Sequence, residues 1–398
     1  MLSANPGAVH AQQAATVVSG VELDAGTEQE FVDGMTAYAG RDYQRAELRF
    51  RRILDRNPRL LRVRLELART LFMEKKDEQA DYQFRLAAGE HPPPVVARNI
   101  ARFREAIRAR RSWRFNFEAG VAPDSNINSA TDKQSIDIYG LPFQLDPSAR
   151  KRSGTGIFAG GHASMRLRRS ARVPIYISGY GRWTRYSDHH FDDAYAGAEA
   201  GPEFGLAGGR LRTTATGLVR WYGQRLLVGS FGGRADYERL VGGKWTVGGM
   251  ATLRYNDYAR RSDVDGWDAE LRGSVNRPVG ATALGRAHIG IERNWANDPG
   301  QAYWRHSLGM GLLKEVGWGL RPGLAIDVAR QVGDGPLAPF GKKRRDWLLQ
   351  GSVSIYKRDW NFRGFAPSLS LSFSRNYSTL PLYEERRLRG EVRVTKAF

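Results

Sequence analysis

The segment WRFNFEAGV, at residues 113–121, alternates apolar and polar side chains residue by residue. Because successive side chains of a β-strand point to opposite faces, this pattern predicts a strand with one apolar and one polar face. The apolar face carries Trp113, Phe115, Phe117, Ala119 and Val121, and the polar face carries Arg114, Asn116 and Glu118. Similar segments start near residues 155, 174, 193, 210, 230, 243, 266, 281, 302, 318, 346, 367 and 386, which makes fourteen with the first.

The spacing of these segments predicts a 14-stranded antiparallel transmembrane β-barrel over residues 113–398. They recur about every 20 residues, which suits strands of about 9–11 residues that cross a bilayer. The mean hydropathy of −0.50 argues against a transmembrane helix, but not against a barrel, whose alternating strands average out as hydrophilic. Tight connections at 241–243, 276–280 and 316–317 alternate with longer polar ones at 123–153, 331–345 and 376–385. This alternation is typical of outer-membrane barrels.

Aromatic residues and the C-terminus support the same prediction. Aromatic side chains often bound the apolar faces, as a lipid-facing girdle requires: Trp113, Trp183, Trp221, Trp245, Tyr255, Trp267, Trp295, Trp304 and Trp347. The last strand carries Val392, Val394 and the terminal Phe398 on its apolar face. A terminal aromatic is the kind of signal that bacterial barrel-insertion machinery favours. We therefore expect periplasmic chaperones, the barrel-assembly machinery and outer-membrane lipid as partners of a monomeric barrel.

A helical repeat precedes the barrel, over residues 28–112. Gly34, Ala46, Phe50 and Pro58 recur as Ala68, Ala80, Phe84 and Pro92, each 34 residues later. This period and these residue types match the tetratricopeptide helix–turn–helix repeat, in which small residues let helices approach and an aromatic fills the space between hairpins. Tyr43, Phe50, Leu67 and Phe84 are predicted to surround the concavity of the repeat, which becomes the expected client-binding groove under the family resemblance given below. Residues 1–27 form a leader, either disordered or the remnant of a signal peptide.

The positive charge lies mainly in the barrel. The chain has 61 Lys and Arg against 42 Asp and Glu, a net charge of +19, which would suggest nucleic acid as a partner. The arginines of the strands fall mainly opposite the apolar face, so we expect them in the lumen: Arg212, Arg220, Arg254, Arg272, Arg286, Arg389 and Arg393. A basic, water-filled lumen would attract anions or acidic chains and explains the charge without nucleic acid.

The sequence offers little chemistry for catalysis. Without cysteine, thiolate metal sites and thiol nucleophiles are excluded. His189-His190-x-Asp192-Asp193 is the one dense ligand-like cluster, and it lies in a connection where polar residues are the default. Asp124-x-Asn126-x-Asn128 opens like a calcium loop but lacks the required Gly and Glu. We expect no metal, no cofactor and no enzymatic activity.

Several segments together resemble the surface lipoprotein assembly modulator family of outer-membrane translocons, the type XI secretion system. They are Asn57-Pro58, the run from Arg62 to Arg69, Leu71-Phe72, Ala80, Gln83-Phe84, Pro92-Pro93, Trp113 and the loop Asp124-Ser125-Asn126-Ile127-Asn128. The resemblance implies a periplasmic tetratricopeptide domain, a 14-stranded barrel in the bacterial outer membrane, and Asp124, Ser125, Asn126 and Asn128 as a family motif. It further implies export of surface lipoproteins or of soluble haem- or metal-scavenging proteins. The repeat region is short and the barrel unusually basic for this pattern.

The predicted function is thus a non-enzymatic translocon that exports or displays client proteins. The alternative is a passive porin that prefers anions, which would leave the helical repeats without a purpose. A third reading, an outer-membrane enzyme, would depend on His189 or His190.

Overall fold

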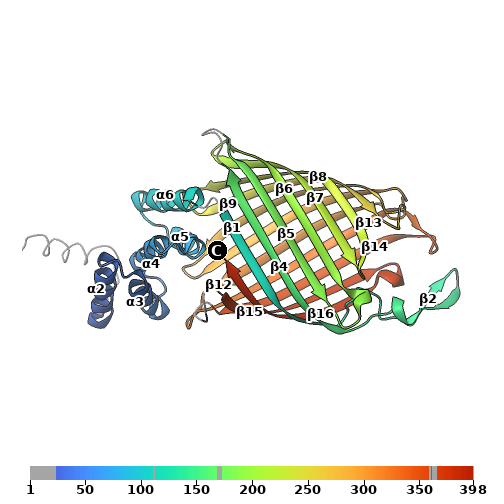
Figure 1. The fold of residues 1–398 in the computed structure, drawn as a ribbon, viewed down its shortest axis with the longest axis horizontal. Coiled ribbons are helices and arrows are strands. Elements are labelled where there is room, and N and C mark those ends of the chain that lie inside the picture. Colours follow the sequence, from blue (N-terminus) through green and yellow to red (C-terminus); the bar gives the residue numbers. More distant parts are fainter. Residues whose placement is uncertain (1–23, 111–112, 168–172, 358–359, 361–364, 398) are drawn as a thin grey trace, which may run out of the picture. The chain divides into compact units, whose positions relative to one another are not determined.

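The computed structural model describes residues 24–110, 113–167, 173–357, 360 and 365–397. Apart from residues 24–27, the expected leader lies outside the described residues, and so does the terminal Phe398. A helical unit and a sheet unit follow one another along the chain and are described in turn (Figure 1).

Five helices make up the described part of the N-terminal unit: α2 (Ala25–Ala39), α3 (Tyr43–Arg56), α4 (Leu61–Met73), α5 (Asp77–Gly89) and α6 (Pro94–Arg110). The first helix begins three residues earlier than the expected boundary at 28. The Asp24 side chain accepts a hydrogen bond from the Thr27 backbone N–H, so Asp24 is an N-cap and not part of the leader. None of the described helices combines the length and hydrophobicity that crossing a membrane demands.

The helices pack as the 34-residue spacing predicts. Ala46, Ala68 and Ala80 are completely buried between neighbouring helices. Gly34 shows why the first repeat position is small: a Cβ placed there would lie 2.7 Å from Phe50 Cε1, well inside van der Waals contact. The repeat spacing therefore marks the contacts that hold the antiparallel helices together, and the tetratricopeptide-type prediction is confirmed.

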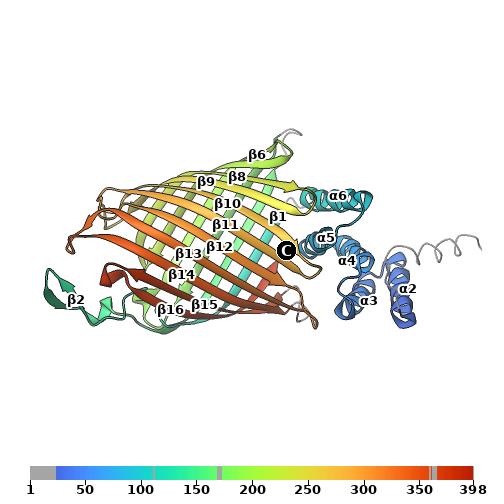
Figure 2. The same cartoon turned by 180° about the vertical axis from the view of Figure 1, so that it is seen from behind.

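The sheet unit is a closed antiparallel barrel of fourteen strands, as predicted (Figures 1 and 2). Its strands are β1 (Trp113–Asp124), β4 (Gly154–Leu167), β5 (Ile175–Arg185), β6 (Asp193–Leu206), β7 (Gly209–Tyr222), β8 (Arg225–Val241), β9 (Trp245–Tyr258), β10 (Gly266–Val279), β11 (Ala283–Ala296), β12 (Tyr303–Lys314), β13 (Leu320–Leu337), β14 (Lys342–Lys357), β15 (Phe365–Ser378) and β16 (Glu385–Ala397). Each strand pairs with its sequence neighbours, and β1 closes the ring against β16.

The barrel has two different rims. We call near rim the one at which β1 starts and β16 ends, and far rim the opposite one. The near rim also carries short turns such as 207–208 and 242–244. The far rim carries the long segment 125–153 and the connections 186–192 and 379–384. Short turns on one side and a long loop on the other give the barrel the polarity of outer-membrane proteins.

Apolar side chains of the strands face away from the lumen. Leu271 and Ile289, for example, are 59% and 66% exposed, whereas the residues that alternate with them are mostly polar or glycine. Large apolar residues remain this exposed on a folded protein when lipid covers them. On this outer face Trp267 makes T-shaped contacts with Phe231 and Tyr255, which are tilted against each other, and the ring centroids are 5.5–6.4 Å apart.

The far rim contains folded structure that the sequence did not predict. Within segment 125–153, β2 (Ser135–Ile138) and β3 (Leu141–Gln144) form a hairpin. Its Ile136 packs in an apolar cluster with Leu337 at the end of β13 and with Phe340 and Leu380 from two other far-rim connections.

The predicted long connection at 331–345 is wrong. Strand β13 continues to Leu337 and β14 begins at Lys342, so only residues 338–341 connect them. A register shift between Val332 and Pro336 absorbs the glycine- and proline-containing stretch that looked like a loop.

Candidate functional site: the barrel seam and lumen

The seam between β1 and β16 joins the two ends of the sheet. Its pairing runs from Asn116 opposite Ala397 to Val121 opposite Val392, lapses, and resumes with Asp124 opposite Arg389. Pro123 lies in the lapse and has no N–H to donate. Strand β1 pairs without a break with β4 on its other side, so the interruption is specific to the seam.

Asp124 closes the far end of this seam. Its side chain is completely buried, with Oδ2 3.0 Å from Arg387 Nε and 3.4 Å from Arg389 Nη1 on β16. Its Oδ1 accepts the backbone N–H of Asn126 at 2.9 Å. A buried carboxylate is tolerated only when its charge and lone pairs are matched. These contacts match them and join the first strand to the last.

Ser125 and Asn126, the next motif residues, continue this attachment. The Ser125 backbone N–H donates to Leu388 O at 2.9 Å, and its hydroxyl accepts the Leu388 N–H at 2.8 Å. The Asn126 side chain bonds both the N–H and the carbonyl of Ala130, at 3.1 and 2.8 Å. The Ser125 hydroxyl and the Asn126 amide thus form hydrogen bonds with backbone groups of Leu388 and Ala130 at the point where β1 ends.

Asn128 ties the start of the far-rim segment to its end. Its Nδ2 donates to Arg150 O at 2.7 Å, and its Oδ1 accepts the Arg152 N–H at 3.0 Å. Asp124, Ser125, Asn126 and Asn128 therefore lie together and hold backbone in place. We call this set the seam clasp.

A second charge cluster lies further along the seam, inside the barrel. Arg182 of β5 donates to Glu118 Oε1 of β1 at 3.1 Å and to Glu391 Oε1 of β16 at 2.7 Å. Arg393 of β16 reaches Glu118 Oε2 at 3.2 Å. The cluster links three strands across the lumenal side of the seam. Sequence reasoning missed Glu118, Arg182 and Glu391 as a group because only strand register brings them together.

The predicted lumenal arginines lie opposite the exposed apolar face, but most of them have acidic partners. Arg212 pairs with Glu203, Arg220 with Asp193, Arg254 with Asp268, Arg272 with Glu270, Arg389 with Asp124 and Glu391, and Arg393 with Glu118. Arg286 makes no ion pair with the residues that the structure describes. Most of the positive charge at these positions is thus paired, because cross-strand register supplies acids that a count of charges cannot place. The basic lumen itself stays a prediction.

The predicted client-binding groove of the helical unit also needs correction. Phe50, Leu67 and Phe84 are 0%, 1% and 1% exposed and form the unit's core, so they cannot contact a client. Their spacing marked packing positions and not a surface. Tyr43 is half-buried, with its ring 5.5 Å from that of Tyr38.

The helical unit contains an unusual pair of carboxyl groups. Burial, together with the neighbouring Glu47, raises the pKa of Glu74 to about 7. For Glu47, burial opposes ionisation, but Arg51 and hydrogen bonds from Glu74 and Lys76 outweigh it and lower its pKa to about 2. Lys76 Nζ lies 3.0 Å from Glu74 Oε2. Glu74 therefore keeps its proton to a higher pH than a free carboxyl group does, while Glu47 is ionised.

The histidine cluster is held by local contacts in the far-rim connection 186–192. His190 Nδ1 lies 2.8 Å from Asp188 Oδ1, and His189 Nδ1 lies 3.2 Å from Asp192 Oδ2. Over the described ranges of the chain, no three potential metal ligands come together. At the other end of the barrel, Val392 and Val394 are exposed on the outer face. The insertion signal predicted to end in Phe398 stays a prediction, since that residue is outside the described part.

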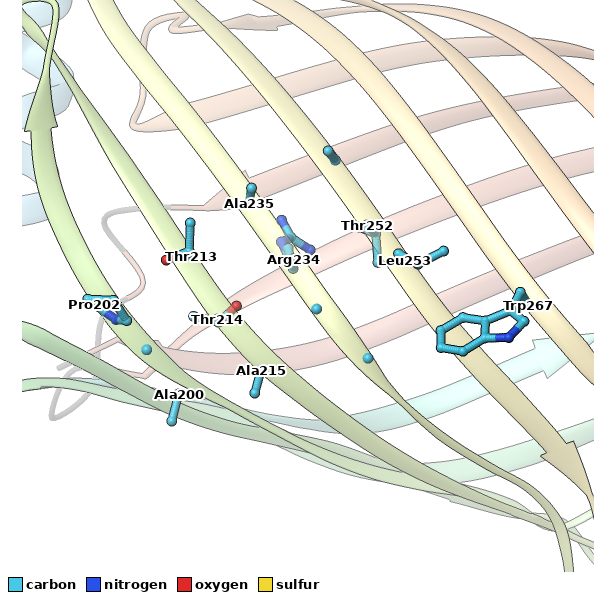
Figure 3. A pocket seen from close by; sticks show the side chains of 14 residues that line it. Ala200, Pro202, Thr213, Thr214, Ala215, Arg234, Ala235, Thr252, Leu253 and Trp267 are labelled. Atoms are coloured by element: carbon cyan, nitrogen blue, oxygen red, sulfur yellow. The ribbon is translucent and has the colours of Figure 1, made fainter.

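A hollow of about 840 Å³ lies at the barrel wall. Small residues of four adjacent strands line it, among them Ala200, Ala215 and Gly233, and Trp267 borders it (Figure 3). Of its described lining residues, Arg234 alone is charged, and its guanidinium binds Asp236. The hollow is therefore mainly apolar.

A helical repeat unit followed by a closed fourteen-stranded barrel with an apolar outer face defines an outer-membrane β-barrel protein. Residues 113–398 match the surface lipoprotein assembly modifier family, and residues 29–84 match the N-terminal tetratricopeptide repeats of the same family. The chain belongs to the surface lipoprotein assembly modifier family.

Several relatives have names that describe their roles. Surface lipoprotein assembly modifier 1 of Neisseria meningitidis is 26% identical over 92% of this chain and 75% of its own length. The surface lipoprotein assembly modifier of Moraxella catarrhalis is 25% identical over 82% of this chain and 64% of its own length. The hemophilin secretion modulator of Acinetobacter baumannii is 21% identical over 88% and 75%. Among solved structures, a loop-deletion mutant of the outer-membrane protein OmpT of Vibrio cholerae matches 72% of this chain and 100% of its own, at 8% identity and a TM-score of 0.38.

Proposed function

We propose that this protein is a non-enzymatic outer-membrane translocon that exports or displays client proteins at the cell surface. One observation carries the proposal: the same chain joins a tetratricopeptide-type unit, a fold commonly used to hold other polypeptides, to a barrel of a family named for surface lipoprotein assembly. The relatives' names support two kinds of client, a surface lipoprotein and the secreted protein hemophilin.

In this proposal the helical unit lies in the periplasm and receives the client. The near rim carries the first residues of β1 and the end of β16, and short-turn rims of such barrels face the periplasm. The helical unit exposes apolar side chains for contact with an unfolded chain, including Val32, Leu48 and Val95. Periplasmic chaperones would deliver the client, and the barrel-assembly machinery would insert the barrel.

The energy for export would come from the client itself. Folding of the client outside the cell would make the step directional without nucleotide hydrolysis. The paired lumenal charges suit this role, because arginines already bound to acidic side chains hold an acidic chain less tightly than free arginines would. The same pairing reduces the free positive charge that favoured an anion-selective porin.

The test is surface display of a client in a strain that lacks this gene. The candidate client is the product of a neighbouring gene, made once with its lipid anchor and once as a soluble secreted protein. The strain is supplied with the full chain, with the barrel 113–398 alone, or with an empty vector, and surface exposure is measured by protease shaving of intact cells.

We expect exposure with the full chain and little with the other two, provided that outer-membrane levels of the two barrels match. Equal exposure in all three strains would defeat the translocon proposal. In that case, steady anion-selective conductance in planar bilayers would favour the porin. The two client forms separate lipidated from soluble cargo.

A further inference from the structure

Four arginines face outward on the barrel wall near the far rim: Arg330 of β13, Arg345 of β14, Arg375 of β15 and Arg386 of β16. We call them the outer cationic patch. The four strands lie side by side on the face of the barrel seen in Figure 2. The patch is separate from the lumenal network, which lies on the opposite face of the same strands.

Strand alternation fixes the outward direction. On β15, Arg375 alternates with exposed Leu371, Phe373 and Tyr377. On β16, Arg386 is two residues from exposed Leu388. By the same rule Arg330 continues the outward row of Ile326 and Val328 on β13, and Arg345 precedes Trp347 on β14.

The patch lies at the level of an aromatic belt. Arg330 is directly opposite Trp347 in the strand register, and Trp347 is opposite Tyr377. The Arg330 guanidinium lies 5.1 Å from the Trp347 ring centroid, and that of Arg375 lies 4.4 Å from the Tyr377 centroid. Aromatic belts mark the headgroup region of a bilayer, where an outward arginine costs far less than at the midplane. The rings also hold the guanidinium groups in fixed positions.

Two of these arginines oppose one another without a counter-charge. Arg375 and Arg386 are direct cross-strand partners in the β15–β16 register. Like charges in this arrangement repel. Within the described ranges, no carboxylate lies within ion-pair distance of Arg345, Arg375 or Arg386. The protein by itself therefore leaves a concentrated positive charge on a face that meets lipid.

A neighbouring arginine shows that this is a local feature. Arg293 of β11 also lies against the belt, 5.2 Å from the Trp304 ring centroid. Unlike the patch, it has an acid of its own, because Arg293 Nη1 donates to Asp334 Oδ1 at 2.7 Å. Asp334 thus supplies the counter-charge of Arg293. The charge of the four patch arginines is available to an anion from outside the protein.

We infer that the outer cationic patch binds the phosphate-bearing headgroup of an outer-leaflet lipid. Guanidinium groups match phosphate oxygens in charge and bidentate geometry. Exposed Leu349, Phe373 and Leu388 adjoin the arginines and would be covered by the acyl chains of the same molecule. A free phosphate ion would satisfy the charge but leave that apolar surface uncovered, so the structure favours a lipid.

The experiment measures lipid binding to the full chain, purified and delipidated in a non-ionic detergent. The probes are bis-phosphorylated lipid A, the same lipid with both phosphates removed, and inorganic phosphate. The test variant is Arg375→Gln/Arg386→Gln. The matched control is Arg239→Gln/Arg277→Gln, which removes two outward arginines near the near rim. Their outward direction follows from their neighbours: Arg239 is opposite exposed Val247, and the Arg277 guanidinium lies 4.5 Å from the Trp245 ring centroid.

We expect wild type and control to bind lipid A with the same affinity, and the test variant to bind it at least about tenfold more weakly, as the loss of charge-assisted contacts implies. Removal of the phosphates should weaken wild-type binding similarly, and inorganic phosphate should not compete. Without lipid, the test variant should melt at or above the wild-type temperature because its like-charge repulsion is gone. Arg375→Lys/Arg386→Lys, which keeps the charge, should retain part of the affinity and serves if the glutamine variant does not fold.

Three results would overturn the inference. They are unchanged lipid A binding by the glutamine variant, equal binding of the lipid without phosphates, and full competition by inorganic phosphate, which would mean a site for the free ion. If the glutamine variant does not fold, the wild-type protein alone decides: equal affinity for lipid A with and without its phosphates would overturn the inference.

Discussion

Replacement of Asp124 by asparagine removes one negative charge from the seam clasp without changing the size of the side chain. The amide oxygen can still accept the Asn126 N–H, which is 2.9 Å from Asp124 Oδ1 in the wild type. What is lost is the charge that faces Arg387 and Arg389. We therefore expect the barrel to fold to the same structure but to hold its seam less firmly.

The magnitude follows from the two arginines. Hydrogen bonds to charged groups contribute about 1.5–3 kcal/mol each. Arg389 keeps a second partner in Glu391, at 3.0 Å, so its loss is small. Arg387 loses its main partner, but its side chain is 26% exposed and water compensates part of the loss. Together we expect the free energy of unfolding to fall by about 2 kcal/mol.

The assay is equilibrium urea unfolding of the barrel in detergent, followed by tryptophan fluorescence. Asp263→Asn is the control, since its partner Arg261 is exposed and the pair lies in a far-rim connection; no measurable change is expected there. Combining Asp124→Asn with Arg387→Gln should cost less than the sum of the two single changes, because both remove the same contact. Equal stability of Asp124→Asn and wild type, or simple additivity of the two changes, would refute the assigned role of Asp124.

Three further predictions concern other parts of the chain. Phe84→Ala should destabilise the helical unit by about 3–5 kcal/mol, because Phe84 is buried and its ring centroid is 5.1 Å from that of Phe103; circular dichroism at 222 nm should show the helical melt shift, and an unshifted melt would contradict the core assignment. Folding raises the pKa of Glu74 from 4.5 to about 7, so the unfolded state releases this proton first and the unit should lose stability as pH rises from about 4.5 to 7. The loss in the free energy of unfolding should reach on the order of 1–2 kcal/mol at pH 8, and Glu74→Gln should abolish most of it. An unchanged pH dependence of the melts in this variant would exclude Glu74 as its source. Ala119 is opposite Val394 across the seam, and the chain has no cysteine of its own. The double variant Ala119→Cys/Val394→Cys should therefore form a disulfide, detected by protection of both thiols from maleimide labelling, whereas Ala119→Cys/Val392→Cys should not. The reverse result would show a different seam register.

Much of the barrel follows from local sequence, because alternation of side chains is a property of each strand alone. The fourteen strands and the start of the first at Trp113 needed no long-range information. Strand ends were harder to predict. Strand β8 starts at Arg225, ahead of the expected 230, because the two-residue turn at 223–224 precedes it. The hairpin β2–β3 was missed because its strands are short and depend on the apolar cluster around Leu337 and Leu380.

The candidate sites were harder to predict than the fold, and for physical reasons. The pairing of Arg182 with Glu118 and Glu391 depends on which residues register across the seam, and composition carries no such information. In the helical unit, the 34-residue spacing identified the correct residues but the wrong role. Phe50 and Phe84 recur because each fills the space between packed helices. The same packing buries them, so they are not available on the surface.

The seam clasp has a consequence for how the protein is made. Asp124 and Arg387 are 263 residues apart in the chain, so this contact closes a very large loop. The carboxylate of Asp124 obtains its counter-charge only once the final strand has been synthesised and has arrived. A chain that ends early keeps an uncompensated charge at the edge of an open sheet. The clasp thereby ties closure of the ring to the arrival of the last strand.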